Sequence, residues 1–332
     1  MELRTLFLFI FLAVLCWFRP VVVYAELPMV AIVLPKGIER YAIAHSGFEE
    51  RWGQCPKASQ TDLYVQRPSP EKLSLANSIR KAVGFDAKII GVYGDRAALA
   101  VVREIPNVPV VFGEVYAPAE IGLPSPGESS ERFTGISNFT PVRTMLRNFR
   151  GVSPSKQLGV IYDPDDLAGR WQYRQIVDML PNLGMEGQEI LMGIEDAPGK
   201  ELFQQGDRFD AVFVTDSYAL TSNLQKMVDL ADQSDVPVIS QIPNLADSGA
   251  LIDMAADPRE QGEALADMVC KLLSGESAGN IPVLSPSRVE LVINLRQAKR
   301  FGFRIPFQVL GMATRIIQDQ EVPPQTGTLK MK

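Results

Sequence analysis

The chain of 332 residues has one histidine, three cysteines and few of the glycine-rich motifs that mark nucleotide-binding or hydrolytic enzymes. With His45 alone, a histidine-rich zinc site or a serine–histidine triad is hard to build, and we expect this side chain to be packed or solvated on a helix. Neither GxGxxG nor GxxxxGK[ST] occurs. The serine of "GESAG" (residues 275–279) follows a predicted helix rather than a strand, so we interpret it as part of a loop. The sequence therefore predicts neither a bound cofactor nor a metal site.

Basic clusters are also missing. Asp and Glu (39) outnumber Lys and Arg (33), and the formal net charge is −6. A nucleic-acid-binding surface needs clustered basic side chains. We therefore expect no nucleic-acid partner.

The first 25 residues resemble a secretory signal peptide. An apolar run, Leu6 to Trp17, follows Arg4 and has the length of a signal-peptide core. "VYA" ends at Ala25, which places the cleavage before Glu26. The run is shorter than the ~20 apolar residues that a membrane anchor needs. A lipoprotein is disfavoured because a leucine, not a small residue, precedes Cys16.

Cleavage would leave two cysteines, Cys55 and Cys270, in an oxidising compartment. They lie far apart in the sequence and form no metal or redox motif. The sequence leaves two alternatives open: one disulfide, or two separate thiols with Cys270 on the apolar face of a helix.

Short apolar runs alternate with helix-like stretches from Met29 onward. "AKIIGVYG" and "VPVVFGEV" are apolar without alternation, as expected for strands that are buried on both faces. Strands that alternate with helices predict a parallel, doubly wound sheet. The pattern restarts after "FTGISNFTP" (residues 133–141), which we interpret as a hinge strand. The sequence therefore predicts two α/β units.

Ligands of open α/β sheets bind beyond the carboxyl ends of the strands. Polar and aromatic side chains follow several predicted strands, and Asn138 lies at the joint between the units. Each could instead cap a helix or be solvated, and Asp95, Asp166 and Ser217 are candidate caps. The candidate ligand-binding residues are Tyr93, Asp95, Glu114, Tyr116, Ser137, Asp163, Thr215, Asp216, Ser240 and Gln241.

The stretch "LGVIYDPDD" (residues 158–166) permits one enzymatic alternative. An apolar strand that ends in D-x-D is similar to the first motif of haloacid-dehalogenase-like phosphatases, with Asp163 as the nucleophile and Asp165 as the acid. Thr215 could imitate their second motif. The third Mg²⁺ ligand of such enzymes is not evident in the sequence.

Several segments, in order along the chain, resemble the ABC transporter substrate-binding proteins related to tryptophan- and tyrosine-binding components. These segments are "GDRAALA", "IPNVPVVFGEVYAP", "TGISNFTP", "LGVIYDPDD", "DAVFVTDS" and "VELVINLRQAKRFGFRIP". The last is close to E-L-V-I-N-x-x-x-A-K-x-L-G-L-x-I-P and is the most specific. The resemblance runs from about Met29 to Ile317.

This resemblance implies the type I periplasmic binding protein fold, with two parallel-sheet lobes joined by a three-segment hinge. Lobe 1 would comprise residues 26–137 and 249–280, lobe 2 residues 138–248 and 281–318, and residues 319–332 a disordered tail. The chain would be a periplasmic monomer rather than an enzyme, and it would deliver a small ligand to a permease and an ATPase in the membrane. A sensory protein of the same fold that feeds a membrane receptor is the alternative.

The chain departs from this family at residues that would contact the ligand. Asp95 and Arg96 replace a Thr-Pro pair, Tyr116 begins the replacement of Ser-Asp-Pro, and Asp163 replaces an asparagine. Because buried carboxylates need partners, these changes favour an amino acid or similar amine that differs from tryptophan or tyrosine. An anionic ligand would be surprising unless Arg96 faces the cleft.

Roles follow from this hypothesis. Asp163 and Asp216 would hold the cationic group of the ligand. Ser137 and backbone N–H groups near Asp95 would hold a carboxylate or hydroxyl. Tyr93 and Tyr116 would supply aromatic contacts.

Overall fold

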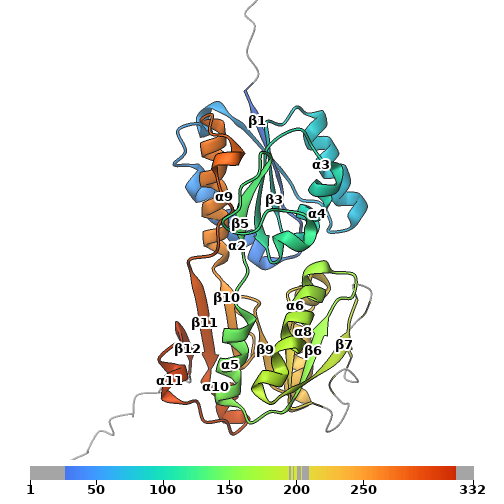
Figure 1. The fold of residues 1–332 in the computed structure, drawn as a ribbon, viewed down its shortest axis with the longest axis vertical. Coiled ribbons are helices and arrows are strands. Elements are labelled where there is room, and N and C mark those ends of the chain that lie inside the picture. The colour runs from blue at the N-terminus through green and yellow to red at the C-terminus, as the bar shows by residue number, and fades with distance from the viewer. Residues whose placement is uncertain (1–26, 194–195, 197, 200–202, 204–208, 319–332) are drawn as a thin grey trace, which may run out of the picture.

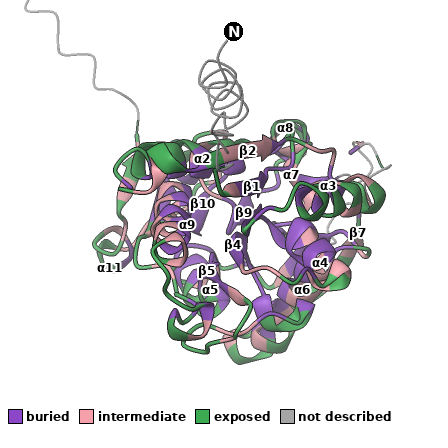
Figure 2. Ribbon diagram, turned by 90° about the horizontal axis from the view of Figure 1, so that it is seen from above, coloured by how far each residue is buried: buried purple, intermediate pink, exposed green. Residues whose placement is uncertain are grey.

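The computed structural model describes residues 27–193, 196, 198–199, 203 and 209–318, so the predicted signal peptide and the predicted disordered tail lie outside the described residues. The described chain forms two α/β lobes, one above the other in Figure 1, each built around its own sheet. Within these ranges, no helix is long and apolar enough to cross a membrane. Figure 2 shows buried residues gathered on the strands and on the inner faces of the helices.

Lobe 1 contains a five-stranded parallel sheet in the order β2-β1-β3-β4-β5. The strands are β1 (Met29–Val33), β2 (Asp62–Gln66), β3 (Ile89–Tyr93), β4 (Val110–Val115) and β5 (Phe133–Ser137). Strands β3 and β4 are buried along their whole length, as their unbroken apolar sequences predict. Helices α3 (Lys72–Gly84) and α4 (Asp95–Glu104) cover one face, and α2 (Glu39–Trp52) and α9 (Pro258–Leu273) cover the other.

The helices α2 and α9 are packed unusually closely. A Cβ atom added at Gly262 of α9 would lie 1.6 Å from the backbone oxygen of Ala44 in α2, so only glycine allows this approach. A disulfide between Cys55 and Cys270 joins the chain just after α2 to α9. It settles the alternative that the sequence leaves open, and it fixes α9 to lobe 1.

Lobe 2 contains a seven-stranded sheet in the order β12-β11-β10-β9-β8-β6-β7. Its strands are β6 (Gln157–Tyr162), β7 (Glu186–Leu191), β8 (Ala211–Val214), β9 (Val238–Ser240), β10 (Ile252–Ala256), β11 (Val289–Asn294) and β12 (Arg315–Ile317). Its helices are α5 (Val142–Val152), α6 (Leu167–Met179), α7 (Tyr218–Thr221), α8 (Leu224–Gln233), α10 (Leu295–Arg300) and α11 (Phe307–Leu310).

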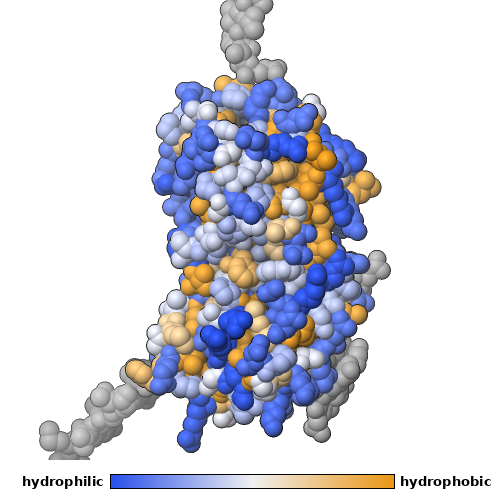
Figure 3. Space-filling model, viewed as in Figure 1, coloured by the Kyte–Doolittle hydropathy of each residue, from blue (hydrophilic) through white to orange (hydrophobic). Residues whose placement is uncertain are grey.

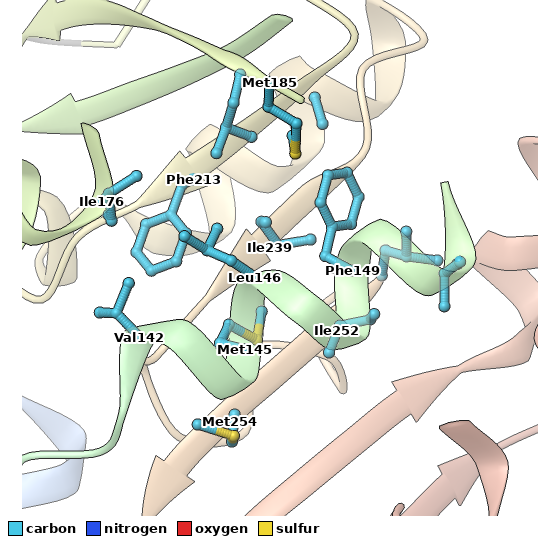
Figure 4. Packing of buried hydrophobic residues seen from close by; sticks show 14 of the residues in the cluster. Val142, Met145, Leu146, Phe149, Ile176, Met185, Phe213, Ile239, Ile252 and Met254 are labelled. Carbon is cyan, nitrogen blue, oxygen red and sulfur yellow. The ribbon is translucent and has the colours of Figure 1, made fainter. Parts of the chain in front are cut away.

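Lobe 2 has two hydrophobic clusters, one that includes α8 and one between the sheet and the helix α5. Figure 4 shows Met145, Leu146 and Phe149 of α5 directed at side chains of the sheet, among them Phe213 and Ile252. All five side chains are completely buried. This packing holds the start of α5, and therefore the preceding crossover at residues 138–141, against the sheet.

The structure corrects one assignment. The sequence analysis places residues 249–256 in lobe 1, but β10 pairs with β9 in parallel and with β11 in antiparallel orientation in the second sheet. The Leu251 N–H already donates to the Val238 carbonyl, so the strand registers with lobe 2 immediately after a compact turn. The chain returns to lobe 1 with α9 and the segment that follows it, because Ile281 and Val283 also belong to the hydrophobic clusters of lobe 1. The antiparallel β10–β11 pair also makes this sheet mixed rather than wholly parallel.

The chain crosses between the lobes three times, after β5, between β10 and α9, and before β11. Two of these segments lie side by side, because Ile136 and Leu284 form an isolated parallel bridge. The lobes are therefore joined by adjacent strands of backbone rather than by a continuous sheet, which is the arrangement of a hinge.

Candidate ligand-binding site

The carboxyl ends of the strands in both sheets meet between the lobes. As a result, all ten residues predicted from strand ends are buried, with exposed fractions of 9% or less. The structure thus brings the predicted residues to one region. Their assignment as ligand contacts stays a prediction, and the neighbours of each side chain indicate what it can do.

Arg40 in the first turn of α2 is the cation that crosses from lobe 1 to lobe 2. Its Nη1 donates to Asp216 Oδ1, which follows β8, and its Nε lies 3.2 Å from Glu114 Oε2. Both side chains of the Arg40–Asp216 pair are buried. Sequence reasoning missed Arg40, because the search was confined to strand ends. One signal was present: a cation in the first turn of a helix opposes the helix dipole and suggests an anionic partner.

Arg96 of α4 makes the second ionic contact between the lobes. Its Nη2 donates to Asp163 Oδ2 at 3.1 Å, and its Nε lies 3.5 Å from Asp166 Oδ2. Its guanidinium carbon lies 5.5 Å from the centre of the Tyr218 ring. Arg96 therefore faces the cleft, and the sequence-based objection to an anionic group on the ligand no longer holds for this part of the site.

A chain of amide side chains links the lobes beside the ion pairs. Tyr116 Oη donates to Gln241 Oε1 at 2.7 Å, and Gln172 Nε2 donates to the same oxygen at 2.7 Å. The Asp216 N–H in turn donates to Gln172 Oε1 at 2.8 Å. Gln172 is completely buried in the middle of α6, and its role could not be predicted from the strand pattern.

Tyr116 also belongs to an aromatic cluster at the crossover. Its ring centre lies 5.5 Å from that of Phe139 and 5.6 Å from that of Trp171, in edge-to-face geometry. These three residues come from lobe 1, the crossover and lobe 2. The Tyr116 ring therefore contacts both the crossover and lobe 2 and helps to join the lobes, and its contact with a ligand stays a prediction.

Glu114 is turned into the site by an irregular backbone. Its φ of 58° lies in the left-handed region, and the register between β4 and β5 shifts between Phe112 and Val115. Such a bulge redirects a side chain at a sheet edge. Asn138 Nδ2 donates to Glu114 Oε2 at 3.2 Å, and Gln261 Oε1 accepts the Glu114 N–H at 3.1 Å.

Burial raises the pKa of three carboxyl groups in the cleft, Glu114, Asp95 and Asp166. It raises the pKa of Glu114 to about 8, against the attraction of Arg40. Burial, followed by the negative charges of Asp166 and Asp216, raises the pKa of Asp95 to about 7. The Asp95 carboxylate accepts the Tyr116 N–H at 3.1 Å, so it supports the β4 end as well as facing the cleft.

Three predicted hydroxyl groups are occupied by the protein's own backbone. Ser137 Oγ accepts the Phe139 N–H at 3.0 Å. Thr215 Oγ1 donates to the Ile161 carbonyl, and Ser240 Oγ donates to the Val214 carbonyl. The Ser137 hydroxyl thus already holds the crossover, and its hydrogen bond to a ligand carboxylate stays a prediction.

The candidate caps have different outcomes. Asp166 caps α6 by accepting the Gly169 N–H at 3.0 Å. Asp95 is the first residue of α4, and Gly94 occupies the cap position with a φ of 84°. A Cβ at Gly94 would lie 1.9 Å from Tyr41 Oη, so glycine is required there. The Oγ of Ser217 and the Oη of Tyr93 are buried without a hydrogen-bond partner among the described residues.

His45 was expected to be either packed or solvated, and in the structure it is packed. Its ring stacks on Phe48 with centres 5.6 Å apart and meets the edge of Tyr93 at 5.8 Å. Burial lowers its pKa, so the ring is neutral at pH 7.

The phosphatase alternative finds no supporting geometry. Asp163 Oδ1 accepts the Asp165 N–H at 2.9 Å while its other oxygen faces Arg96. Asp165 itself is exposed. In the part of the chain that the structure describes, no three His, Cys, Asp or Glu side chains are grouped to hold a metal ion.

Two lobes joined by a hinge, with charged and hydrogen-bonding side chains at their facing strand ends, define the class of two-lobed solute-binding proteins. A family model described as "ABC transporter substrate binding protein" matches residues 57–317. The chain belongs to this family, and its fold is that of the type I periplasmic binding proteins.

Similar proteins agree with this assignment. A tyrosine-binding protein of Clostridioides difficile (strain R20291) is 22% identical over 232 residues, covering 69% of this chain and 66% of that protein. A Streptococcus pneumonia structure described as an ABC domain in complex with L-Trp has a TM-score of 0.81 at 16% identity, covering 88% of this chain and 100% of that one. A conserved domain protein from Vibrio cholerae has a TM-score of 0.78 at 20% identity, with the same coverage.

Proposed function

We propose that this protein is the periplasmic solute-binding component of an ABC importer and that it traps an amino acid or similar amine between its lobes. The mature chain would begin near Glu26, act as a monomer, and present its closed form to a permease and an ATPase in the membrane. The family assignment supports the transport role. The names of the tyrosine-binding relative and of the L-Trp complex support the ligand class.

The observation that carries the proposal is the charge arrangement across the cleft. Lobe 1 contributes the guanidinium groups of Arg40 and Arg96, and lobe 2 contributes the carboxylates of Asp216, Asp163 and Asp166. A zwitterion can enter such an ion pair: its ammonium replaces the guanidinium at the carboxylate, and its carboxylate takes the guanidinium. Each buried charge then keeps a partner, which is the condition for burying charges at all.

The arrangement revises the roles expected from the sequence. Asp216 and Asp163 keep their expected position beside a cation, but in this closed arrangement the protein supplies that cation. The carboxylate of the ligand is better matched to Arg40 than to Ser137, whose hydroxyl is occupied by the Phe139 N–H. Tyr93 Oη and Ser217 Oγ, which are buried without a partner among the described residues, are further donors for a polar ligand.

Acidic groups remain in excess. Asp95 and Glu114 add two carboxyl groups to the three lobe 2 aspartates, against two arginines. Even with Glu114 largely and Asp95 partly protonated near neutral pH, the site does not carry a net positive charge. A ligand with a cationic group therefore fits better than a simple anion.

A thermal-shift screen of residues 26–332 tests the proposal. The panel should contain the common amino acids, their decarboxylated amines, and acidic solutes that lack an amine. A ligand that binds the folded state raises Tm by mass action. At a free ligand concentration of a hundred times Kd, it adds about 2.7 kcal/mol to the free energy of unfolding. We expect shifts from amino acids or amines. Shifts from acidic solutes alone would contradict the proposed ligand class, and phosphomonoester hydrolysis that Asp163→Asn abolishes would contradict the proposed function itself.

A further inference from the structure

Several cavities are lined by residues of both lobes, and two of them, of very different size, adjoin each other. The inner one is lined by Arg40, Tyr93 and Asp216, among others, and its volume is about 20 Å³, enough for one or two water molecules. The second lies between α3 and α4 of lobe 1 and the loop that precedes α6 in lobe 2, and its volume is about 480 Å³. Small-molecule sites commonly have volumes of about 300–1,000 Å³. Of these two cavities only the second has this size, and a further interlobe cavity of about 610 Å³ beside α2 and α8 has a mostly polar lining.

The two cavities are neighbours. Pro70, Asp95, Arg96 and Asp166 line both, so the Arg96–Asp166 contact stands between them. Arg96 is the partly exposed member of this contact, with a side-chain exposed fraction of 24%. A rotation of this side chain would join the inner cavity to the outer one.

The outer cavity, which we call the lateral groove, has an apolar floor built from both lobes. Ile121 and Ala100 are buried in lobe 1, and Leu99 of α4 is half-buried beside them. Leu167 is contributed by lobe 2 and packs against the apolar core of lobe 1. At the rim, Leu73 of α3 is 68% exposed. Figure 3 shows hydrophobic residues gathered over the part of lobe 1 where α3 and α4 lie.

Charged side chains line the groove on both lobes. Lobe 2 contributes the carboxyl groups of Asp163, Asp165 and Asp166, whereas lobe 1 contributes both signs, with Lys72, Arg96 and Arg103 beside Asp95 and Glu104. The apolar floor lies between them. A wholly polar solute would gain nothing from this floor, whereas an apolar body would remove it from water.

We propose that the ligand is an elongated solute, with a charged amino-acid-like head between Arg40 and Asp216 and an apolar body that passes Arg96 and lies in the lateral groove. This inference rests on the proposed function and narrows its ligand class to molecules larger than the common amino acids. Specificity then comes from the groove, and the head supplies the attachment that closes the lobes.

A homologous series of amino acids tests the inference by calorimetric titration of residues 26–332. The probes are 2-aminobutyric, 2-aminohexanoic and 2-aminooctanoic acid, which share one head and differ in the length of the apolar chain. Burial of each methylene is worth about 0.8 kcal/mol, or about a fourfold gain in affinity. We expect the affinity of the wild-type protein to rise along the series with this order of slope.

Two matched variants of α3 locate the effect. Ala76 is half-buried and lines the groove, so Ala76→Trp fills it, whereas the neighbouring Asn77 is exposed and does not line it. We expect Ala76→Trp to abolish the gain with chain length and Asn77→Trp to retain it. Leu73→Ser changes an exposed side chain at the rim and should reduce the gain without disturbing the fold.

Each result decides between the two proposals. Equal affinity for short and long members in the wild type would overturn the elongated ligand and leave the amino-acid site standing. A gain that Ala76→Trp and Leu73→Ser both leave intact would overturn the assignment to the lateral groove. Failure of every member to bind would overturn the inference together with the proposed ligand class.

Discussion

Arg40 of α2 and Asp216 after β8 form a buried ion pair between residues that are 176 positions apart in the sequence. They belong to different lobes, so a motion that separates the lobes would break the pair. Burying two charges is unfavourable unless each satisfies the other. The Arg40–Asp216 pair is therefore both a restraint on the closed arrangement and the point at which a charged ligand can compete.

Removal of Arg40 should destabilise the protein strongly. Arg40→Ala leaves Asp216 buried without its cation, and breaking such a pair costs about 3–5 kcal/mol. Arg51→Ala is a suitable control, because Arg51 pairs with Asp267 where both side chains are about half exposed, and such pairs are worth about 0–1 kcal/mol. Urea unfolding of both variants measures the difference. Equal losses of stability would contradict a special role for the interlobe pair.

The raised pKa of Glu114 predicts a pH-dependent stability difference. Its pKa is about 8 in the folded protein and about 4.5 when solvated. The folded state therefore binds this proton more tightly between these values, and its contribution to stability is present below pH 4.5 and is lost as the pH rises toward 8. Glu114→Gln removes the loss. The Tm of the variant should rise relative to wild type across this range.

The change in pKa of Glu114 on folding sets the upper limit of this stability difference, at about 1.4 kcal/mol per pKa unit. Glu50→Gln provides the background, because Glu50 is exposed and pairs with the surface Arg259. A Tm difference for Glu114→Gln that is constant from pH 4.5 to pH 8, like that for Glu50→Gln, would show that Glu114 is not a buried proton acceptor.

The disulfide should stabilise lobe 1. Cys55 and Cys270 are separated by 215 positions, and opening such a cross-link increases the freedom of the unfolded chain. We expect Cys55→Ser/Cys270→Ser to lose about 2–4 kcal/mol of unfolding free energy. Thermal unfolding with and without reductant gives an independent reading. A thiol assay first shows whether the folded protein has free thiols. If it has none and reductant leaves its Tm unchanged, the stabilising role of the disulfide is contradicted.

Much of the fold follows from the sequence because buried parallel strands and amphipathic helices leave a local pattern. The placement of β10 does not follow, because it depends on which neighbouring strand edge is open. Pairing with β9 directly after a tight turn was decided by tertiary geometry.

Only the part of the site that lies at strand ends could be predicted from the sequence. Strand ends gave the carboxylates, since their location follows from the topology of α/β sheets. Arg40, Gln172 and Gln261 come from helices, and their partners lie on distant segments that only the closed lobes bring together. For the same reason the sequence could not show that Asp163 and Asp216 already face protein cations.

The most direct test is calorimetric titration of the best ligand from the thermal-shift screen into wild type, Asp216→Asn and Asp178→Asn. Asp216 is buried against Arg40, whereas Asp178 is exposed on α6 and is not among the residues that line the lateral groove. Loss of a charge-assisted contact to a buried group weakens binding by about 2–5 kcal/mol. We predict at least a tenfold loss of affinity for Asp216→Asn and little change for Asp178→Asn. Equal affinity in all three proteins would contradict a ligand held between the lobes at Asp216.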